Sequence, residues 1–226
     1  MNYDYDIYAG RVVANAPDTV RAEFISKVYR LFLLSVLVTV GSGWFCAQPT
    51  VLPAILPMLG GVAILTFVVG IVMAFTQRVP GLNVLMLLLF SALEGAIVGP
   101  VLMMVERSAP GVGANAAYLT IAVFTGLTLY TFASKKDFSF LGGFLWTGLL
   151  CLVFAGILMI FLPSAAGSLL YSVAGVVLFS GYILYDTSNI MRRLGPDEAV
   201  AGAIGLYLDL VNLFWFILRL LQSSRD

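Results

Sequence analysis

The sequence predicts an all-α integral membrane protein, built as a bundle of seven transmembrane helices. Of its 226 residues, 61% are hydrophobic and only 11% are charged, and the mean hydropathy is +1.00. Soluble domains carry about 25% charged residues, so this chain lacks the polar surface that a globule in water needs. Apolar runs of about 20 residues, the length that crosses a bilayer, recur along the chain and are separated by short polar turns.

Each predicted span ends at residues that interrupt an apolar helix. Prolines surround the first turn, and the later turns read "TQRVPG", "ERSAPGVG", "SKKD", "PSAAGS" and "RRLGPDE". The bundle covers residues 31–221, with spans at roughly 31–48, 54–75, 83–105, 116–134, 140–162, 168–190 and 203–221.

The segment before the first span, residues 1–30, mixes acids and bases and lacks the basic patch and apolar core of a signal peptide. We expect a retained cytoplasmic tail. Its last part, "TVRAEFISKVYR" at 19–30, is a candidate helix lying at the membrane surface. Residues 222–226 form a short C-terminal tail.

Lysine and arginine predict the orientation, because cytoplasmic loops are enriched in them. Nine of the twelve fall on the side of the N-terminal tail: Arg11, Arg21, Lys27, Arg30, Arg78, Lys135, Lys136, Arg192 and Arg193. The other side holds Arg107, Arg219 and Arg225. The N-terminus is therefore expected in the cytoplasm and, after seven spans, the C-terminus on the outer side.

The composition excludes several kinds of function. The chain has no histidine, which rules out histidine-based catalysis and metal sites, and its net charge of zero gives no attraction to nucleic acid. Cys46 and Cys151 lie in apolar runs and are expected to be small buried hydrophobes. Neither a phosphate-binding loop nor a dinucleotide fingerprint occurs. We expect no enzyme and no cofactor, with carboxylates as the titrating groups.

Two aspartates lie inside the predicted membrane layer. Asp186 precedes Arg192 by six residues, which places it about 9 Å below the cytoplasmic boundary at the helical rise. The next span starts near Gly202 on the same side, so Asp209 lies about 10 Å deep. Because a short turn joins the two helices, we expect them to be antiparallel neighbours with both acids at one level.

The same two helices carry an amide beside each acid, Asn189 and Asn212, three residues further on. An ionised aspartate at a helix centre costs roughly 2.5–3.5 kcal/mol. Two adjacent carboxyl groups can instead share one proton, so the pair would respond to pH as a unit. Arg78, at the end of the second span, is the available cation. The alternative is a static polar clasp that only holds the helix register.

A third acid, Glu94, is expected near mid-depth. It is either a protonated side chain bonded to a neighbouring helix or a ligand along a cation path, since carboxylates suit calcium, and the sequence leaves both open. Gly95 and Gly99 in "EGAIVGP" have the four-residue spacing of small residues that lets membrane helices approach closely.

At these segments the chain resembles the Bax inhibitor family, the transmembrane Bax-inhibitor-motif proteins, in its bacterial branch. The segments are "AFTQR" (74–78), "KKDFSFLGGFL" (135–145), "YSVAGVVLFSGYILYDTSNI" (171–190) and "AIGLYLDLVNLFWFILRLL" (203–221). The resemblance runs over all seven spans. It implies a seven-helix bundle with the last helix at the centre, in a bacterial inner membrane.

The resemblance also implies a function, a pH-sensitive calcium leak. The positions that match its gate are Asp186, Asp209 and Arg78, and the two aspartates would hold calcium transiently. Bacterial relatives are also linked to the membrane protease FtsH. The alternative function is therefore modulation of that protease through the cytoplasmic tail and helix contacts.

An intramembrane aspartyl protease is the remaining alternative, because "YD" at 185–186 has the look of its first acid and paired carboxyls can activate water. Those enzymes carry Gly-x-Gly-Asp at the second acid. Here the sequence reads Leu206, Tyr207, Leu208, Asp209, so we do not expect proteolysis.

Overall fold

The computed structural model describes residues 12–134 and 136–223, and within these ranges all regular structure is helical. Arg11, Lys135 and Arg225, which contribute to the predicted orientation, and most of the predicted C-terminal tail lie outside the described residues, as do residues 1–10. The long helices are α1 (Asp18–Cys46), α3 (Leu59–Thr76), α4 (Leu82–Ser108), α5 (Val112–Ser134), α6 (Gly142–Phe161), α7 (Ala165–Arg192) and α8 (Ala199–Ser223). Short elements complete the chain: η2 (Val13–Asn15), α2 (Leu52–Ile55), η3 (Leu56–Met58) and η4 (Ser139–Leu141).

The prediction of seven membrane-spanning helices is confirmed, since seven helical segments are long and apolar enough to cross a bilayer. Their outward faces carry large apolar side chains; Phe75 is 83% exposed and Ile160 is 75% exposed. Such faces suit lipid and would be costly in water. Among the seven, α8 has the largest buried share, half of its apolar window.

The helix α1 is longer than the first predicted span. Residues 19–30 form its first turns, and the helix continues without a break to Cys46. Most residues of this charged stretch are compatible with a helix interior, so the mixed charge does not end the helix. A position of these turns at the membrane surface stays a prediction.

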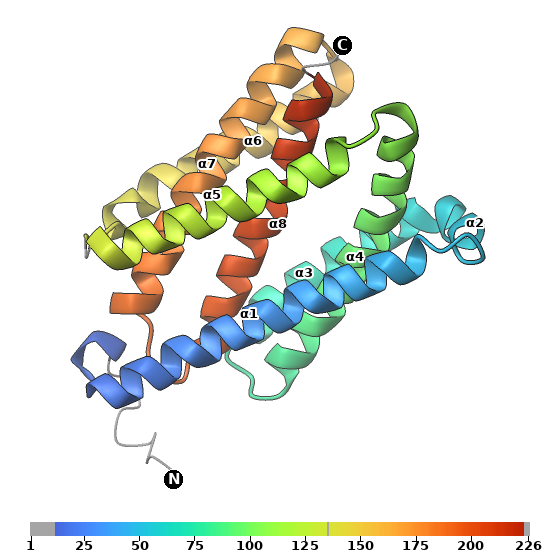
Figure 1. Ribbon diagram of the computed structural model, residues 1–226. Coiled ribbons are helices and arrows are strands. Elements are labelled where there is room, and N and C mark those ends of the chain that lie inside the picture. Colours follow the sequence, from blue (N-terminus) through green and yellow to red (C-terminus); the bar gives the residue numbers. More distant parts are fainter. Residues whose placement is uncertain (1–11, 135, 224–226) are drawn as a thin grey trace. The chain divides into compact units, whose positions relative to one another are not determined.

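The helices form two compact units (Figure 1). One unit, called here the α1–α4 unit, holds α1 to α4 with Leu194–Tyr207. The other, the α5–α7 unit, holds α5 to α7 with the part of α8 that starts at Leu208. In the α1–α4 unit, α4 packs against both α1 and α3, and in the α5–α7 unit, α7 packs against both α5 and α6.

Glycines bring α1 and α4 into backbone contact, which confirms the close approach predicted from Gly95 and Gly99. A methyl group added at Gly99 would overlap the carbonyl of Gly43, and one added at Gly95 would overlap the Thr39 carbonyl and the Ser42 hydroxyl. Only hydrogen fits at both positions. This packing brings the Thr39 hydroxyl of α1 within hydrogen-bonding distance of the Ser91 carbonyl of α4.

Candidate functional site

The antiparallel packing of α7 on α8 is set by aromatic side chains and one glycine. The ring of Phe216 on α8 stacks on Phe179, with centroids 5.6 Å apart, and lies 5.3 Å from the ring of Tyr171. Gly175 leaves room for the Phe216 ring, because a Cβ at this position would overlap it. These contacts fix the register between the two helices.

That register brings the two predicted aspartates together. Asp186 follows Phe179 by seven residues, and Asp209 precedes Phe216 by seven, so each acid lies two helical turns from the stacked rings and on the same face. The carboxyl groups of Asp186 and Asp209 are hydrogen-bonding neighbours. Asp209 is only 4% exposed, and Asp186 is half-buried. The sequence-based expectation that the two acids meet agrees with this geometry.

The groups around the acid pair leave some of its hydrogen-bonding atoms without a partner. The Asn189 amide donates to the Asp186 carboxyl group, and the Tyr182 hydroxyl lies close enough to interact with both acids. Oδ2 of Asp209 is buried without a hydrogen-bond partner, as is Oδ1 of Asn189. A buried carboxyl oxygen without a donor is costly when it is charged. The free energy of this buried position therefore depends on the number of protons that the acid pair holds.

The sequence predicted that each acid has an amide beside it on the same helix face. One of these amides, Asn212, bonds elsewhere, and one further neighbour of the acids, Tyr182, was missed. Asn212 donates to the carbonyl of Leu208 on its own helix, at 2.8 Å, while Asn189 bonds to Asp186. Tyr182 was not singled out from the sequence. Its position four residues before Asp186, one turn away on the same face, is the signal that could have found it.

Arg78 lies in the turn that follows α3, and its partner in the structure is Glu198. The Arg78 Nη2 atom is 3.3 Å from Glu198 Oε1, and the arginine side chain is 88% exposed. Glu198 also accepts a hydrogen bond from the Gly195 backbone at 2.9 Å and directly precedes α8. The predicted pairing of Arg78 with the aspartates stays a prediction.

Glu94 lies in the α1–α4 unit, where it is 8% exposed and close enough to the Tyr207 hydroxyl to interact with it. The hydroxyls of Tyr207 and Thr39 are 2.6 Å apart, and Thr39 Oγ1 is also 3.0 Å from the Ser91 carbonyl. The structure thus places Glu94 beside a chain of neutral hydroxyl groups that links α8, α1 and α4.

Polar contacts, called here the latch, join the loop before α6 to the end of α7. They were not predicted from the sequence. The Phe138 backbone donates to Ser188 Oγ at 3.0 Å, and Arg193 contacts both Ser139 Oγ and, at 3.6 Å, Asp137 Oδ2. The Ser139 backbone N–H is the main cause that lowers the pKa of Asp137 below its usual value. Ser188 lies two residues after Asp186, so the latch holds the end of α7 that carries the acid.

The acid pair supplies few ligands for a metal ion. Among the described residues, no group of three or more cysteine, aspartate or glutamate side chains could hold a metal ion. Resident calcium sites take six to eight oxygen ligands. The carboxyl oxygens of Asp186 and Asp209 with the Asn189 amide oxygen supply fewer.

Comparisons with known proteins point to one family. Residues 21–226 match the family described as "Inhibitor of apoptosis-promoting Bax1". The chain is 35% identical to Protein lifeguard 4 of Mus musculus over 96% of this chain and 92% of that protein. It is 34% identical to Bax inhibitor 1 of Schizosaccharomyces pombe, over 95% and 81% of the two chains. An uncharacterized protein of Campylobacter jejuni is 33% identical, over 98% and 97%.

Proposed function

Because this chain belongs to the Bax inhibitor family, we propose that it is a pH-sensitive calcium leak of the membrane, gated by Asp186 and Asp209. The observation that carries the proposal is the meeting of two carboxyl groups from α7 and α8, of which Asp209 is buried and Asp186 is half-buried. Intramembrane acids are expensive and mark ion paths or switches.

The proposed mechanism uses one shared proton. While the pair holds it, a carboxyl O–H on one side can donate to the other, and α7 and α8 stay joined. Loss of the proton leaves two like charges at short range in a medium of low polarity, which favours separation of the helices. The freed carboxylate oxygens then offer a calcium ion hard ligands along the path.

Arg78 is proposed to bias the same equilibrium from the α1–α4 unit. Its exposed ion pair with Glu198 is weak, because surface pairs contribute about 0–1 kcal/mol. So weak a pair would let Arg78 exchange Glu198 for another acid, as the family resemblance implies. Glu94 is kept as a supporting polar group of the path.

The test is calcium uptake into proteoliposomes between pH 5 and 8, with Asp186→Asn, Asp209→Asn and the wild type. We expect the wild-type rate to change with pH and both variants to lose that dependence. Asp197→Asn is the matched control, since Asp197 is an exposed carboxylate in the turn between the same helices. Identical pH profiles in all four proteins would remove the proposal.

The chain is a multi-pass membrane protein with bacterial homologues. We place it in a bacterial inner membrane with a cytoplasmic N-terminus and an external C-terminus, supported by the asymmetry of lysine and arginine. A C-terminal alkaline phosphatase fusion should be active and a C-terminal green fluorescent protein fusion dark; the reverse would invert the topology.

Modulation of the protease FtsH is the alternative that the family resemblance offers, and the same preparation separates it from the leak. Deleting residues 1–25 should leave calcium uptake and its pH profile unchanged if the protein is a channel. A deletion that alters turnover of FtsH substrates in cells, together with aspartate variants that leave uptake unaffected, would favour the alternative.

A further inference from the structure

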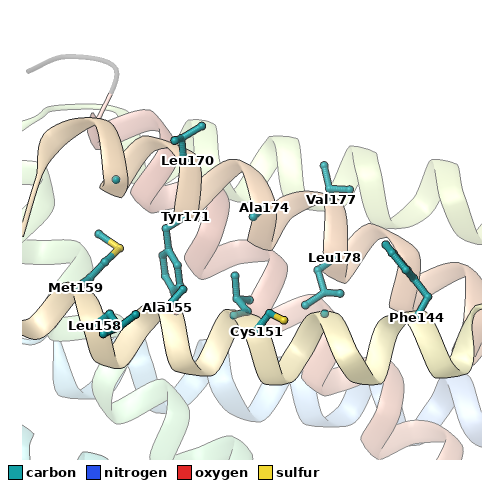
Figure 2. Close-up of a pocket in the computed structure, with 13 residues that line it drawn as sticks. Phe144, Cys151, Ala155, Leu158, Met159, Leu170, Tyr171, Ala174, Val177 and Leu178 are labelled. Atoms are coloured by element: carbon teal, nitrogen blue, oxygen red, sulfur yellow. The ribbon is translucent and has the colours of Figure 1, made fainter. Parts of the chain in front are cut away.

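An apolar groove runs between α6 and α7, within the α5–α7 unit, and has a volume of about 720 Å³. Figure 2 shows Tyr171, Ala174 and Leu178 along α7 facing Cys151, Ala155 and Met159 along α6. This volume lies within the range of small-molecule sites, about 300–1,000 Å³. The side chains at the groove are apolar except for the Tyr171 hydroxyl.

Small side chains make this groove. Gly148 and Gly156 on α6 leave room for Leu178 and Tyr171, since a Cβ at either glycine would lie 2.7 Å from the facing side chain. Ala155 and Ala174 leave the space between the two helices open. The groove extends from Gly167 to Leu178, eleven residues or about 16 Å along α7. That is about half of a 30 Å hydrocarbon core, the depth of one leaflet.

A cation lies at one end of the groove. The Arg219 guanidinium is 5.0 Å from the centroid of the Tyr171 ring, and its Nε donates to Ser168 Oγ at 3.3 Å. Arg219 is exposed, and among the described residues no carboxylate forms a salt bridge with it. Gly167 also lines this end, so the N-terminus of α7, where backbone N–H groups favour anions, is close by.

The depth of this cation matches that of a lipid headgroup. Ser168 is the third residue of the sixth membrane-spanning segment, and Arg219 lies four residues before the end of the seventh. The apolar groove is as long as one leaflet is deep, which suits an acyl chain. Arg219 lies at the level of the membrane surface, which suits the phosphate of a phospholipid. Guanidinium groups bind phosphate through paired hydrogen bonds.

We propose that the α6–α7 groove binds one acyl chain of a glycerophospholipid whose phosphate is held by Arg219. The site is separate from the acid pair and does not depend on calcium conduction. It gives the protein a structural lipid on the side of the membrane opposite to Arg192 and Arg193.

The test is native mass spectrometry of the purified full-length chain, titrated with dioleoylphosphatidylglycerol and, separately, with dioleoylglycerol, which has the same acyl chains but no phosphate. We expect one phospholipid to bind more tightly than the diacylglycerol. Arg219→Gln should weaken phosphatidylglycerol binding about tenfold, the effect of one charge-assisted contact, and leave diacylglycerol unchanged. Arg107→Gln, an exposed arginine at the end of α4, is the control and should have no effect.

A second variant tests the groove itself. Ala174→Phe fills it from an exposed position, so it should abolish binding of both lipids without unfolding the protein. Ala122→Phe, at an exposed position on α5, should bind like the wild type. Three results would overturn the proposal. The first is equal binding of both lipids to the wild type and to Arg219→Gln, and the second is retention of lipid by Ala174→Phe. The third is a lipid-free dimer of the wild type that Ala174→Phe dissociates.

Discussion

Tyr207 and Asp209 are buried polar side chains that lie two residues apart on α8, and they differ in how their oxygen atoms are hydrogen-bonded. The Tyr207 hydroxyl, in the α1–α4 unit, is bonded to Thr39, whose hydroxyl also reaches the carbonyl of Ser91. Asp209, in the α5–α7 unit, meets another acid and keeps one oxygen without a donor. Hydroxyl groups stay neutral near neutral pH, whereas the two adjacent carboxyl groups are the ones that we propose to share a proton.

The helix contacts around these residues differ in the same way. The contact of α1 with α4 is made by backbone atoms at Gly43, Gly95 and Gly99, with no room for a side chain between the helices. The contact of α7 with α8 is made by side chains, the stacked rings of Phe179 and Phe216 and the acid pair. A contact made by side chains can adjust when a side chain changes its rotamer. A contact made by backbone atoms can change only if the two helices move apart. We therefore expect pH to act on the α7–α8 contact and to leave α1 and α4 together.

The largest effect is expected at the glycine contact. Gly99→Leu should unfold or strongly destabilise the protein, because the added side chain would overlap the Gly43 backbone and overpacking costs at least about 1–3 kcal/mol. Thermal unfolding in detergent measures it. Gly126→Leu on α5, where the space is open, is the control and should unfold near the wild-type temperature. Equal melting of the two variants would contradict backbone contact.

A smaller effect is expected from Phe216→Ala, which removes the ring that sets the α7–α8 register. We expect a loss of about 2–3 kcal/mol in stability, from lost contacts with Tyr171 and Phe179. Because the same contacts align the acids, calcium uptake should also lose its pH dependence. Trp215→Ala, one residue away on α8, is the comparison. Destabilisation with an unchanged pH profile would mean that the acids meet without the rings.

Tyr207→Phe should cost about 1 kcal/mol, the value of one hydrogen bond, and this cost should be the same at every pH between 5 and 8. The measurement is stability at several pH values beside Asp209→Asn, whose difference from the wild type should vary with pH. The exposed Tyr118 gives the control Tyr118→Phe. A pH-dependent cost for Tyr207→Phe would show that the α1–α4 unit also titrates.

The smallest effect is expected at the latch. The pKa of Asp137 is lowered in the folded protein, chiefly by the Ser139 backbone N–H. The ionised form therefore favours folding, and this contribution is present above the usual aspartate range and disappears as the pH falls through the folded pKa. Asp137→Asn should be slightly less stable than wild type at pH 7, with the difference vanishing in acid. Asp197→Asn, at an exposed carboxylate in the turn before α8, is the control for the loss of a surface charge.

The sequence predicted the parts of this molecule that follow from spacing and polarity. The seven spans came from apolar length, the contact of Asp186 with Asp209 from their equal depth on helices joined by a short turn, and the close helix approach from Gly95 and Gly99. A helix at 19–30 and a span at 31–48 were predicted separately, and the sequence did not show that a single unbroken helix, α1, joins them.

Contacts between residues distant in the chain could not be predicted from one sequence. Thr39 with Tyr207, Arg78 with Glu198 and Asp137 with Arg193 depend on how separate helices and loops pack, and periodicity within one helix carries no such information. The α6–α7 groove was also missed, since it arises from small residues on two helices at once.

Infrared difference spectroscopy of the carboxyl groups tests most directly whether Asp186 and Asp209 share a proton. Spectra of the protein in lipid, recorded between pH 5 and 8, should contain a protonated-carboxyl band that changes with pH in the wild type and is absent from both Asp186→Asn and Asp209→Asn. A band that persists unchanged in either variant, or a wild-type spectrum without a titrating carboxyl, would contradict the account.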